Sequence, residues 1–314
     1  MTITQLQYVL AIAEHKNFTK AAAKCCVTQP TLSTQIQKLE EELNILIFDR
    51  SKKPIELTQV GQKIVQQARN IVNESERIQD IVDQQKGFIG GEFKLGIIPT
   101  VMPTLLPMFL KTFMKKHSKV KLKIDELTTE DIIQQLDEGH LDAAIAATPL
   151  ENKTIKERVI YYEPFVGYVP EGHRLFQKEK LKTSDLDIDD MLLLEEGHCF
   201  RDGIINICKS LKNHEDDKLQ LESGSIETLI KLSNEGLGMT LLPYLHTLDL
   251  HDHQKQYLRE FEQPTPAREI SLIYNKSELK MQIINALFDV ISGIIRGAIA
   301  FQNVEIISPL PKNK

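Results

Sequence analysis

The sequence lacks several features that would assign the chain to a particular class of protein. Its 314 residues contain no apolar run of about 18 residues, so we expect no transmembrane helix. The N-terminus has no basic cluster ahead of an apolar segment, so we expect no signal peptide and a cytoplasmic protein without a membrane partner. In that compartment thiols stay reduced, and a disulfide is more often transient and functional than structural.

Excess positive charge and metal-binding spacings are also missing. The net charge of −6 argues against a protein that coats nucleic acid, but it does not exclude a small DNA-binding module. Cys25 and Cys26 have no CxxC or histidine spacing around them, so we interpret both as small, partly buried residues rather than zinc ligands. His246, His251 and His253 lie with two aspartates in a polar stretch, which we interpret as a solvated loop. We expect no metal and no bound cofactor.

Residues 1–58 have the pattern of three helices and a two-stranded wing. Leu32, Ile36, Leu39 and Leu43 recur at the spacing of an amphipathic helix, and Thr28 is a suitable N-cap for it. Two short helices joined by a tight turn describe a helix-turn-helix. The exposed face of the second carries small hydroxyl and amide groups that suit base edges and phosphates, with one lysine: Gln29, Thr31, Ser33, Thr34, Gln35 and Lys38. Seven basic residues against six acidic ones leave the module at +1, so a helical bundle with a solvated polar face is the alternative.

Residues 59–86 predict one long helix, because they contain no proline and one glycine. An apolar stripe follows its helical spacing: Val60, Ile64, Ala68, Ile71, Val72, Ile78 and Val82. A long exposed helix must bury such a stripe, and a second copy of itself is the simplest partner. Packing against the chain's own second half is the alternative. The glycine-containing stretch 87–91 then ends the helix.

From Glu92 onward short apolar strands alternate with helices, which predicts parallel sheets with helical crossovers in two α/β lobes. We expect a last amphipathic helix from Ser277 to about Ile295. The expected strands are 93–98, 120–124, 143–146, 165–169, 191–194, 220–222, 237–243 and 270–274.

Hydroxyl side chains follow three of the expected strands, where ligands of open α/β sheets bind. They are Thr100, Thr128 or Thr129, and Ser225. Each is equally suited to be a helix N-cap. Only their convergence on one cleft would make a polar ligand site.

Cys199 and Cys208 stand nine positions apart. Cys199 is flanked by His198 and Arg201, which supply hydrogen bonds and positive charge of the kind that lowers a thiol's pKa. In a helix the two thiols would lie on opposite faces with roughly 13 Å of rise between them, beyond the roughly 4–7 Å Cα separation of a disulfide. If the thiols pair, the segment must refold, so the pair would be a switch. Two unrelated core residues are the alternative.

A long pattern in the N-terminal part resembles the winged helix-turn-helix of LysR-type transcriptional regulators. It comprises Ala21-Ala22, residues 27–33, residues 36–40, Leu43, Phe48-Asp49-Arg50, Leu57-Thr58 and Gly61. The resemblance implies that the helix starting near Thr28, Pro30 included, enters the major groove of double-stranded promoter DNA. It implies phosphate contacts for Arg50, Lys52 and Lys53.

The resemblance to LysR-type regulators also implies the architecture and the assembly. The expected domains are a winged helix-turn-helix at 1–58, a dimerising linker helix and hinge at 59–88, and a periplasmic-binding-protein-like α/β sensor at 89–314. Lobe I would be 92–163 with 269–300, and lobe II 164–268, with the chain crossing near Glu163 and Arg268. A dimer of dimers and contact with RNA polymerase follow from the same resemblance.

The segment 194–208, with residues 98–107 and 225–243, resembles further those LysR-type regulators that sense hydrogen peroxide. This implies that Cys199 is the peroxidatic cysteine and Cys208 the resolving one, in a reversible disulfide that controls antioxidant-defence genes without enzymatic turnover. Peroxide would be held by five residues: Thr100, Thr129, His198, Arg201 and Asp202. One rival hypothesis is a LysR-type regulator triggered by a small metabolite in the cleft. Another, from a different class, is a two-cysteine peroxidase, which would need no DNA-binding module.

Overall fold

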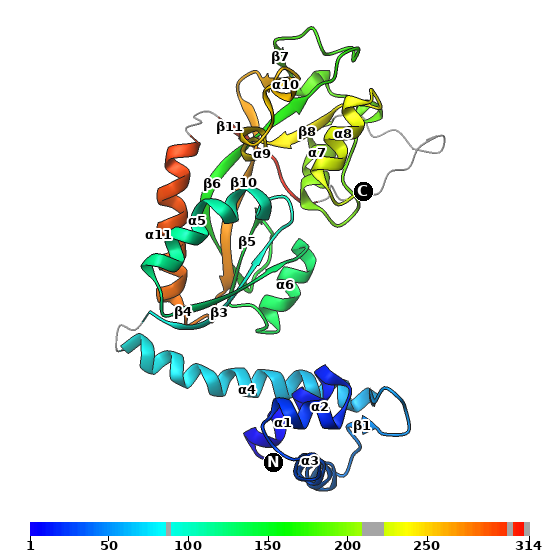
Figure 1. Cartoon of the computed structure of the whole chain (residues 1–314), viewed down its shortest axis with the longest axis vertical. Helices are drawn as coiled ribbons and strands as arrows, with labels where there is room; N and C mark the ends of the chain where they lie inside the picture. The colour runs from blue at the N-terminus through cyan, green and yellow to red at the C-terminus, as the bar shows by residue number, and fades with distance from the viewer. Residues whose placement is uncertain (86–88, 209–222, 300–303, 311–314) are drawn as a thin grey trace. The chain divides into compact units, whose positions relative to one another are not determined.

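The chain forms two compact units in a computed structural model that describes residues 1–85, 89–208, 223–299 and 304–310 (Figure 1). The first unit comprises Met1–Phe88 with Glu138–His140. The second comprises Ile89–Asp137 and Leu141–Lys314. The boundary between the two units, at Phe88 and Ile89, lies close to Glu92, where the sequence pattern changes from helical to alternating strands and helices.

The first unit is a winged helix-turn-helix followed by a long helix, as predicted. Its elements are α1 (Ile3–His15), α2 (Phe18–Lys24), α3 (Gln29–Leu43), the wing strands β1 (Phe48–Asp49) and β2 (Glu56–Leu57), and α4 (Gln59–Gln85). The predicted N-cap at Thr28 is present, and Asn17 caps α2. Asn17 Oδ1 accepts from the Lys20 N–H at 3.0 Å, and Thr28 Oγ1 accepts from the Thr31 N–H at 3.4 Å. Capping fixes where α2 and α3 begin, and so fixes the turn between them.

The linker helix α4 is joined tightly to the wing. Gly61 lies in its first turn, where an added Cβ would come within 2.1 Å of the Ile47 carbonyl oxygen. Ala68 and Val72 of α4 pack with Leu6 of α1. Farther along, Ile78 is 65% exposed within the described chain. The apolar stripe is therefore covered at Ala68 and Val72 but exposed at Val60 and Ile71, and it is uncovered at Ile78 and Val82 in the second half of α4.

The first part of the second unit is a parallel sheet with helical crossovers. Strands β3 (Gly91–Ile97), β4 (Val120–Glu126) and β5 (Ala143–Thr148) are parallel, with β3 in the middle. Helices α5 (Met102–Lys116) and α6 (Thr129–Asp137) connect them. This agrees with the predicted strand–helix alternation.

Two long antiparallel strands, β6 (Ile155–Tyr168) and β10 (Thr265–Asn275), run through both halves of the second unit. The prediction of parallel strands is wrong here, since β10 is antiparallel to β5 and to β6, and β8 is antiparallel to β6. The apolar alternation of 165–169 marks only the end of β6, because the residues before it alternate with charged side chains. Glu163 lies opposite Arg268 in this ladder.

Most of the remaining elements build a second core at the far end of the two long strands, although Leu245 packs in the first core. They are β7 (Lys180–Leu181), β8 (Thr240–Pro243), β9 (Leu258–Phe261), α7 (Cys199–Ile207), α8 (Ile226–Asn234), α9 (Tyr244–Leu248), α10 (Asp252–Lys255), the short 3₁₀ turns Thr183–Asp185 and Ile188–Asp190, and β11 (Val304–Ile306). The expected strand 191–194 is wrong; only Met191 forms a bridge, to Met239. The expected strand 220–222 lies outside the described residues.

Each half of the second unit thus has its own hydrophobic core, and we call the halves the first and second lobes. The first core includes Phe93, Phe109 and Ile145, and the second includes Phe165, Leu229 and Leu241. The expected strand 237–243 is present as β8, which ends at Pro243. The stretch with His246, His251 and His253 forms α9 and α10, so its interpretation as a loop is wrong.

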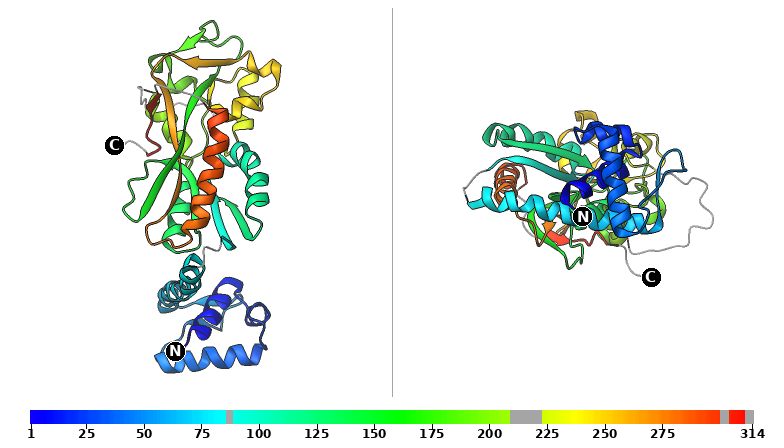
Figure 2. Two further views of the ribbon diagram at one scale, coloured as in Figure 1. Left: turned by 90° about the vertical axis from the view of Figure 1, so that its left-hand side faces the viewer. Right: turned by 90° about the horizontal axis from the view of Figure 1, so that it is seen from below.

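Helix α11 (Met281–Ala298) lies along the first lobe beside the long strands (Figure 2). Among the described helices it is the one long and apolar enough to cross a membrane. Its apolar face, however, is already covered, since Ile284, Leu287 and Ile291 are fully buried in the first core. We therefore interpret α11 as a core helix.

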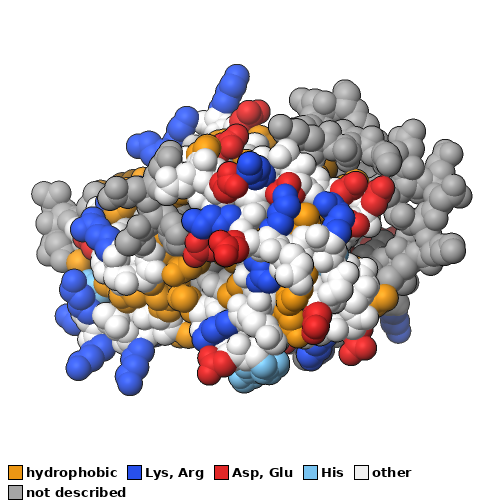
Figure 3. Space-filling model, turned by 90° about the horizontal axis from the view of Figure 1, so that it is seen from above, with side chains coloured by type: hydrophobic (Ala, Val, Ile, Leu, Met, Phe, Trp, Pro, Cys, Tyr) orange, Lys and Arg blue, Asp and Glu red, His pale blue; other side chains and the backbone are white. Residues whose placement is uncertain are grey.

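Charges of both signs are interspersed on the face drawn in Figure 3, with apolar side chains between them. In the second lobe, neighbouring side chains of opposite charge form ion pairs. Lys178 pairs with Asp185 at 2.6 Å, and Lys182 with Glu262 at 3.6 Å. Such mixed, exposed pairs contribute little to stability and form no large field of one sign.

Candidate functional site

Both cysteines of interest lie on helix α7, one at each end. Cys199 is the first residue of the helix, after the N-cap His198, and Cys208 is the C-cap. Both are buried thiols. Cys199 packs in the first core, whereas Cys208 packs in the second with Phe200, Ile204 and Ile207 of the same helix. The helix therefore reaches from its own lobe into the neighbouring one at Cys199.

A buried ion pair lies next to Cys199. Arg268 donates from Nε and Nη2 to Oε2 of Glu163, at 2.9 and 2.7 Å, and both residues are nearly inaccessible to solvent. Glu163 Oε1 accepts from the Leu245 N–H at 3.0 Å. Arg268 also donates from Nη1 to Thr100 Oγ1 at 2.7 Å and from Nη2 to the Thr100 carbonyl at 3.1 Å. Because its charge is compensated and its donors are used, the arginine is held in one orientation.

The environment of Cys199 acts on its thiol in opposite directions. Burial is the largest effect and raises the pKa of the thiol. The Thr129 hydroxyl, the Arg268 charge and the Phe200 N–H lower that pKa, while the Asp202 charge raises it. The expectation that His198 and Arg201 lower the pKa is wrong: burial outweighs the stabilising groups, and the cation that faces the thiol is Arg268.

Two of the expected hydroxyls point to this site and the others do not. Thr100 is buried and bonded to Arg268. Thr129 Oγ1 is buried beside Cys199 without a well-formed hydrogen bond of its own. Thr128 instead bonds Asp131, accepting its N–H at 3.2 Å and donating to its carboxylate at 2.8 Å. Ser225 accepts from the Thr228 N–H at 3.4 Å and caps α8.

The three remaining predicted site residues surround the start of α7. His198 is buried, with Nε2 3.5 Å from a Glu195 oxygen. Arg201 Nη1 lies 3.5 Å from Glu196, while its buried Nε has no hydrogen-bond partner within the described part of the chain. Burial raises the pKa of Asp202, against the lowering effect of Arg201. His198 and Arg201 thus contact the acidic residues before α7, whereas the charge of Asp202 acts on Arg201 and on Cys199.

Two further buried polar groups surround Arg268. The Tyr161 hydroxyl has no hydrogen-bond partner among the described residues, and burial raises its pKa well above the usual value. Burial, and then the charge of Arg268, lower the pKa of His246 to about 4. His246 is therefore neutral at physiological pH, and of these two residues only Arg268 carries a positive charge.

Sequence reasoning missed Arg268 as a site residue and treated it only as a point where the chain crosses between lobes. It lies 69 positions after Cys199, so no local pattern connects the two. A signal was present in the sequence: Arg268 lies two residues before the expected apolar strand 270–274, and a charged residue that is buried in a strand must find a partner. Glu163, interrupting the apolar end of β6, is the matching signal.

The predicted DNA-contact residues lie on the exposed part of the first unit. Gln29, Pro30, Thr31, Thr34, Lys38, Lys52 and Lys53 are exposed, and Ser33 is half-buried. Arg50 is different, since its Nη2 donates to Glu40 Oε2 at 2.7 Å and its guanidinium lies 5.2 Å from the centre of the Phe18 ring. Glu40 is buried and also accepts from the Ile47 and Phe48 N–H groups. Arg50 therefore helps to hold the wing against α3 through its ion pair with Glu40.

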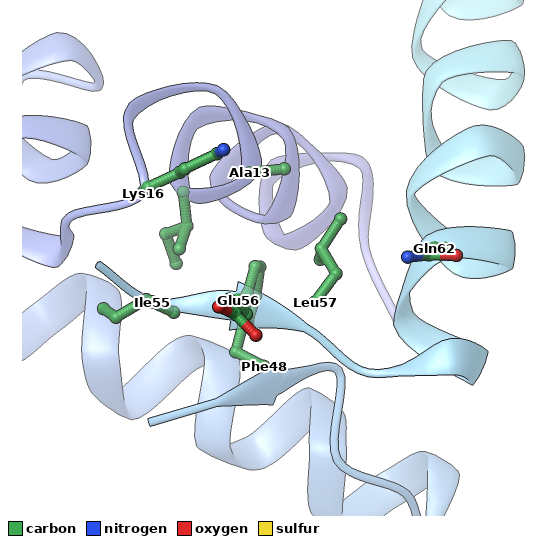
Figure 4. Close-up of a pocket in the computed structure, with 8 residues that line it drawn as sticks. Ala13, Lys16, Phe48, Ile55, Glu56, Leu57 and Gln62 are labelled. Carbon is green, nitrogen blue, oxygen red and sulfur yellow. The ribbon is translucent and has the colours of Figure 1, made fainter. Parts of the chain in front are cut away.

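A pocket of about 290 Å³ lies in the first unit between α1 and the wing (Figure 4). Most of its lining is apolar, and Lys16, Glu56 and Gln62 add polar groups. It contains none of the cysteines. In the described parts of the chain, no group of three or more His, Cys, Asp or Glu side chains is placed to hold a metal ion.

Comparison with known proteins places both units. Residues 3–62 match the family "Bacterial regulatory helix-turn-helix protein, lysR family", and residues 86–293 match "LysR substrate binding domain". A hydrogen peroxide-inducible genes activator of Pectobacterium carotovorum is 34% identical over 274 residues, which cover 87% of this chain and 90% of that protein. A structure of a full-length OxyR variant from Pseudomonas aeruginosa is similar with a TM-score of 0.76 and 32% identity, over 93% of this chain and 98% of that one. A hydrogen-peroxide-bound OxyR mutant from Corynebacterium glutamicum gives 0.63 and 26%, over 97% and 98%.

Proposed function

The chain belongs to the LysR family of bacterial transcriptional regulators, and we propose that it is an OxyR-type member that senses hydrogen peroxide through Cys199 and Cys208. It is a DNA-binding regulator rather than an enzyme, and it controls genes of antioxidant defence. The observation that carries the proposal is the placement of Cys199 at the N-terminus of α7, beside Arg268 and Thr129, with a second buried thiol at the other end of the helix.

In the first step the Cys199 thiolate attacks one oxygen of hydrogen peroxide. An S–O bond forms and the O–O bond breaks, giving a sulfenic acid and a hydroxide that takes up a proton to become water. Arg268 and the N-terminus of α7 supply positive potential to the thiolate. Thr100 accepts from Arg268, so its own hydrogen is available to the peroxide, and the Thr129 hydroxyl lies beside the thiol.

In the second step the Cys208 thiol attacks the sulfenic sulfur. An S–S bond forms and the sulfenic oxygen leaves as water, so that two thiols have given two electrons to one peroxide. The cysteines lie at opposite ends of a nine-residue helix, and no disulfide of ordinary geometry spans such a length. Disulfide formation therefore requires α7 to unwind. Since Cys199 and the rest of α7 pack in different cores, unwinding changes the contact between the lobes.

The response passes to DNA through the first unit. Helix α3 presents Gln29, Pro30, Thr31, Ser33, Thr34 and Lys38 to the major groove, and Lys52 and Lys53 at the wing contact phosphates. A cytoplasmic dimer of dimers, held in part by α4, would place several α3 helices on promoter DNA and present them beside RNA polymerase.

Mass spectrometry after brief, near-stoichiometric peroxide tests the proposal. We expect one Cys199–Cys208 disulfide in the parent chain, and a Cys199 sulfenic acid that over-oxidises in Cys208→Ser. Cys199→Ser should abolish the peroxide response in DNA binding and transcription, and Cys25→Ser is the control that should keep it. A Cys199→Ser protein that still responds to peroxide would contradict the proposal, and a response to a small metabolite alone would favour the other type of LysR regulator.

A further inference from the structure

A C-terminal segment of this chain contacts the last turn of α7, outside the residues that the family match covers. The match to the LysR substrate binding domain ends at residue 293. Residues 304–310, which we call the C-terminal strap, lie beyond it and are all described. The strap begins as β11 and continues to Leu310.

The strap is fixed first to the strand that carries Arg268. Strand β11 pairs in parallel with Thr265–Ala267 of β10. The Ile307 N–H then donates to the Ala267 carbonyl at 2.8 Å, next to Arg268 in sequence. Ile307 packs against the second core, which also contains Cys208. The strap is therefore a part of the second lobe and not a loose end.

The other fixed point is Asn206, in the last turn of α7 and two residues before Cys208. Asn206 Nδ2 donates to the Ser308 carbonyl at 2.9 Å and to the Leu310 carbonyl at 2.8 Å. Pro309, between these two carbonyls, is buried. One amide group thus uses both of its hydrogens on a single segment, which fixes the strap and the end of α7 relative to each other.

We propose that the C-terminal strap holds α7 in its helical, reduced form through Asn206, and so sets how readily Cys199 and Cys208 form a disulfide. The inference rests on the proposed function above. A disulfide between the two ends of α7 must move Asn206 together with its neighbour Cys208, and it then breaks both bonds to the strap. The strap therefore stabilises the dithiol and not the disulfide. Asn206 is a positioning residue, because it acts through the conformation of α7.

The balance of the reaction is unchanged by the strap, which alters only the free energies of its two ends. Two hydrogen bonds between neutral groups are lost on oxidation. A loss of this size corresponds to a change of about tenfold in the equilibrium between dithiol and disulfide. For a two-electron couple a tenfold change is about 30 mV. Removing the bonds should make the disulfide easier to form and harder to reduce.

The test compares the midpoint potential of the Cys199–Cys208 couple in glutathione buffers for the full-length parent and for Asn206→Leu. We expect a potential about 30 mV more negative in the variant, with faster conversion of the Cys199 sulfenic acid to the disulfide. The matched control is Asn285→Leu on α11, which removes an exposed amide that bonds Arg158 and touches neither α7 nor the strap. The control should leave the potential unchanged. A second variant, ending the chain before residue 304, should shift the potential in the same direction.

Thermal unfolding of both redox forms separates this role from a merely structural one. We expect Asn206→Leu to lower the unfolding temperature of the reduced form and to leave that of the oxidised form unchanged. Equal destabilisation of both forms, or an unchanged midpoint potential, would overturn the proposed role of the strap. Failure of the parent chain to form any Cys199–Cys208 disulfide would instead overturn the proposed function.

Discussion

Cys199 and Cys208 begin and end the same helix, yet each is buried in a different hydrophobic core. Cys199 is inserted among first-lobe residues although α7 otherwise packs in the second lobe. A bond between the two sulfurs therefore withdraws a side chain from the first core and unwinds a helix of the second. Such a disulfide forms at the cost of packing and backbone hydrogen bonds, and we expect it to be more easily reduced than a structural disulfide.

Two adjacent threonines allow a matched test of the peroxide site. Thr129→Val removes the hydroxyl beside Cys199, so we expect oxidation by peroxide to slow by about threefold without being abolished, the effect of losing one hydrogen bond. Thr128→Val removes the bonds to Asp131 at the start of α6 instead, which should cost about 1 kcal/mol of stability and leave the rate unchanged. Stopped-flow oxidation and thermal unfolding measure the two effects. Equal slowing in both variants would contradict the assignment of Thr129.

The stability of the second unit should depend on pH through His246. Burial holds its pKa at about 4 in the folded chain, against 6.5 for an ordinary histidine. Because the folded pKa is depressed, the unfolded chain binds a proton first, and stability is lost as pH falls from about 6.5 to about 4. The difference corresponds to about 3 kcal/mol. His246→Gln should flatten the loss in denaturant unfolding over this window, whereas the same change at the exposed His251 should not.

Arg50 and Lys53 should behave differently when each is replaced by alanine. Arg50→Ala leaves the buried Glu40 without its cation, so we expect a loss of about 1–2 kcal/mol in stability and weaker DNA binding as a consequence. Lys53→Ala should keep the stability and reduce the slope of log affinity against log salt by about 1, as for a lost phosphate contact. Chemical unfolding and binding at several salt concentrations distinguish them. A Lys53→Ala protein with an unchanged slope would exclude that contact.

The uncovered half of α4 should mediate self-association. Ile78 and Val82 are 65% and 38% exposed, on a helix that packs against α1 nearer its start, through Ala68 and Val72. A fragment of residues 1–88 should sediment as a dimer, and Ile78→Asp with Val82→Asp should make it a monomer. Gln66→Asp lies on the opposite side of the helix and serves as the control. A parent fragment that remains monomeric at high concentration would rule out this interface.

Local patterns in the sequence predicted the first unit well because its elements depend on neighbouring residues. The N-caps at Asn17 and Thr28 and the apolar spacing of α3 determine where those helices lie without help from distant segments. The same holds for β3, β4 and β5, whose apolar runs are bounded by crossover helices.

The environment of Cys199 was not predictable in this way, because it is built by strand pairing across the whole second unit. His198 and Arg201 are its neighbours along the chain, but the side chain of Arg268 reaches it from β10 and is held by Glu163 on β6. Neither burial of the thiol nor the antiparallel pairing of these strands has a local signature. The switch region could be located from sequence, and its electrostatics could not.

The close approach at Gly61 has a mechanical consequence. Helix α4 starts directly against the backbone at Ile47, and Glu40 joins α3 to the wing, so we expect α3 and α4 to move together. A rotation of the C-terminal end of α4 should then rotate α3 as well, because no flexible segment separates the two helices. The side chain of Gly61→Ala cannot fit unless the backbone at Ile47 moves. We therefore expect this variant still to oxidise its cysteines and still to bind DNA, but to lose the effect of oxidation on DNA binding.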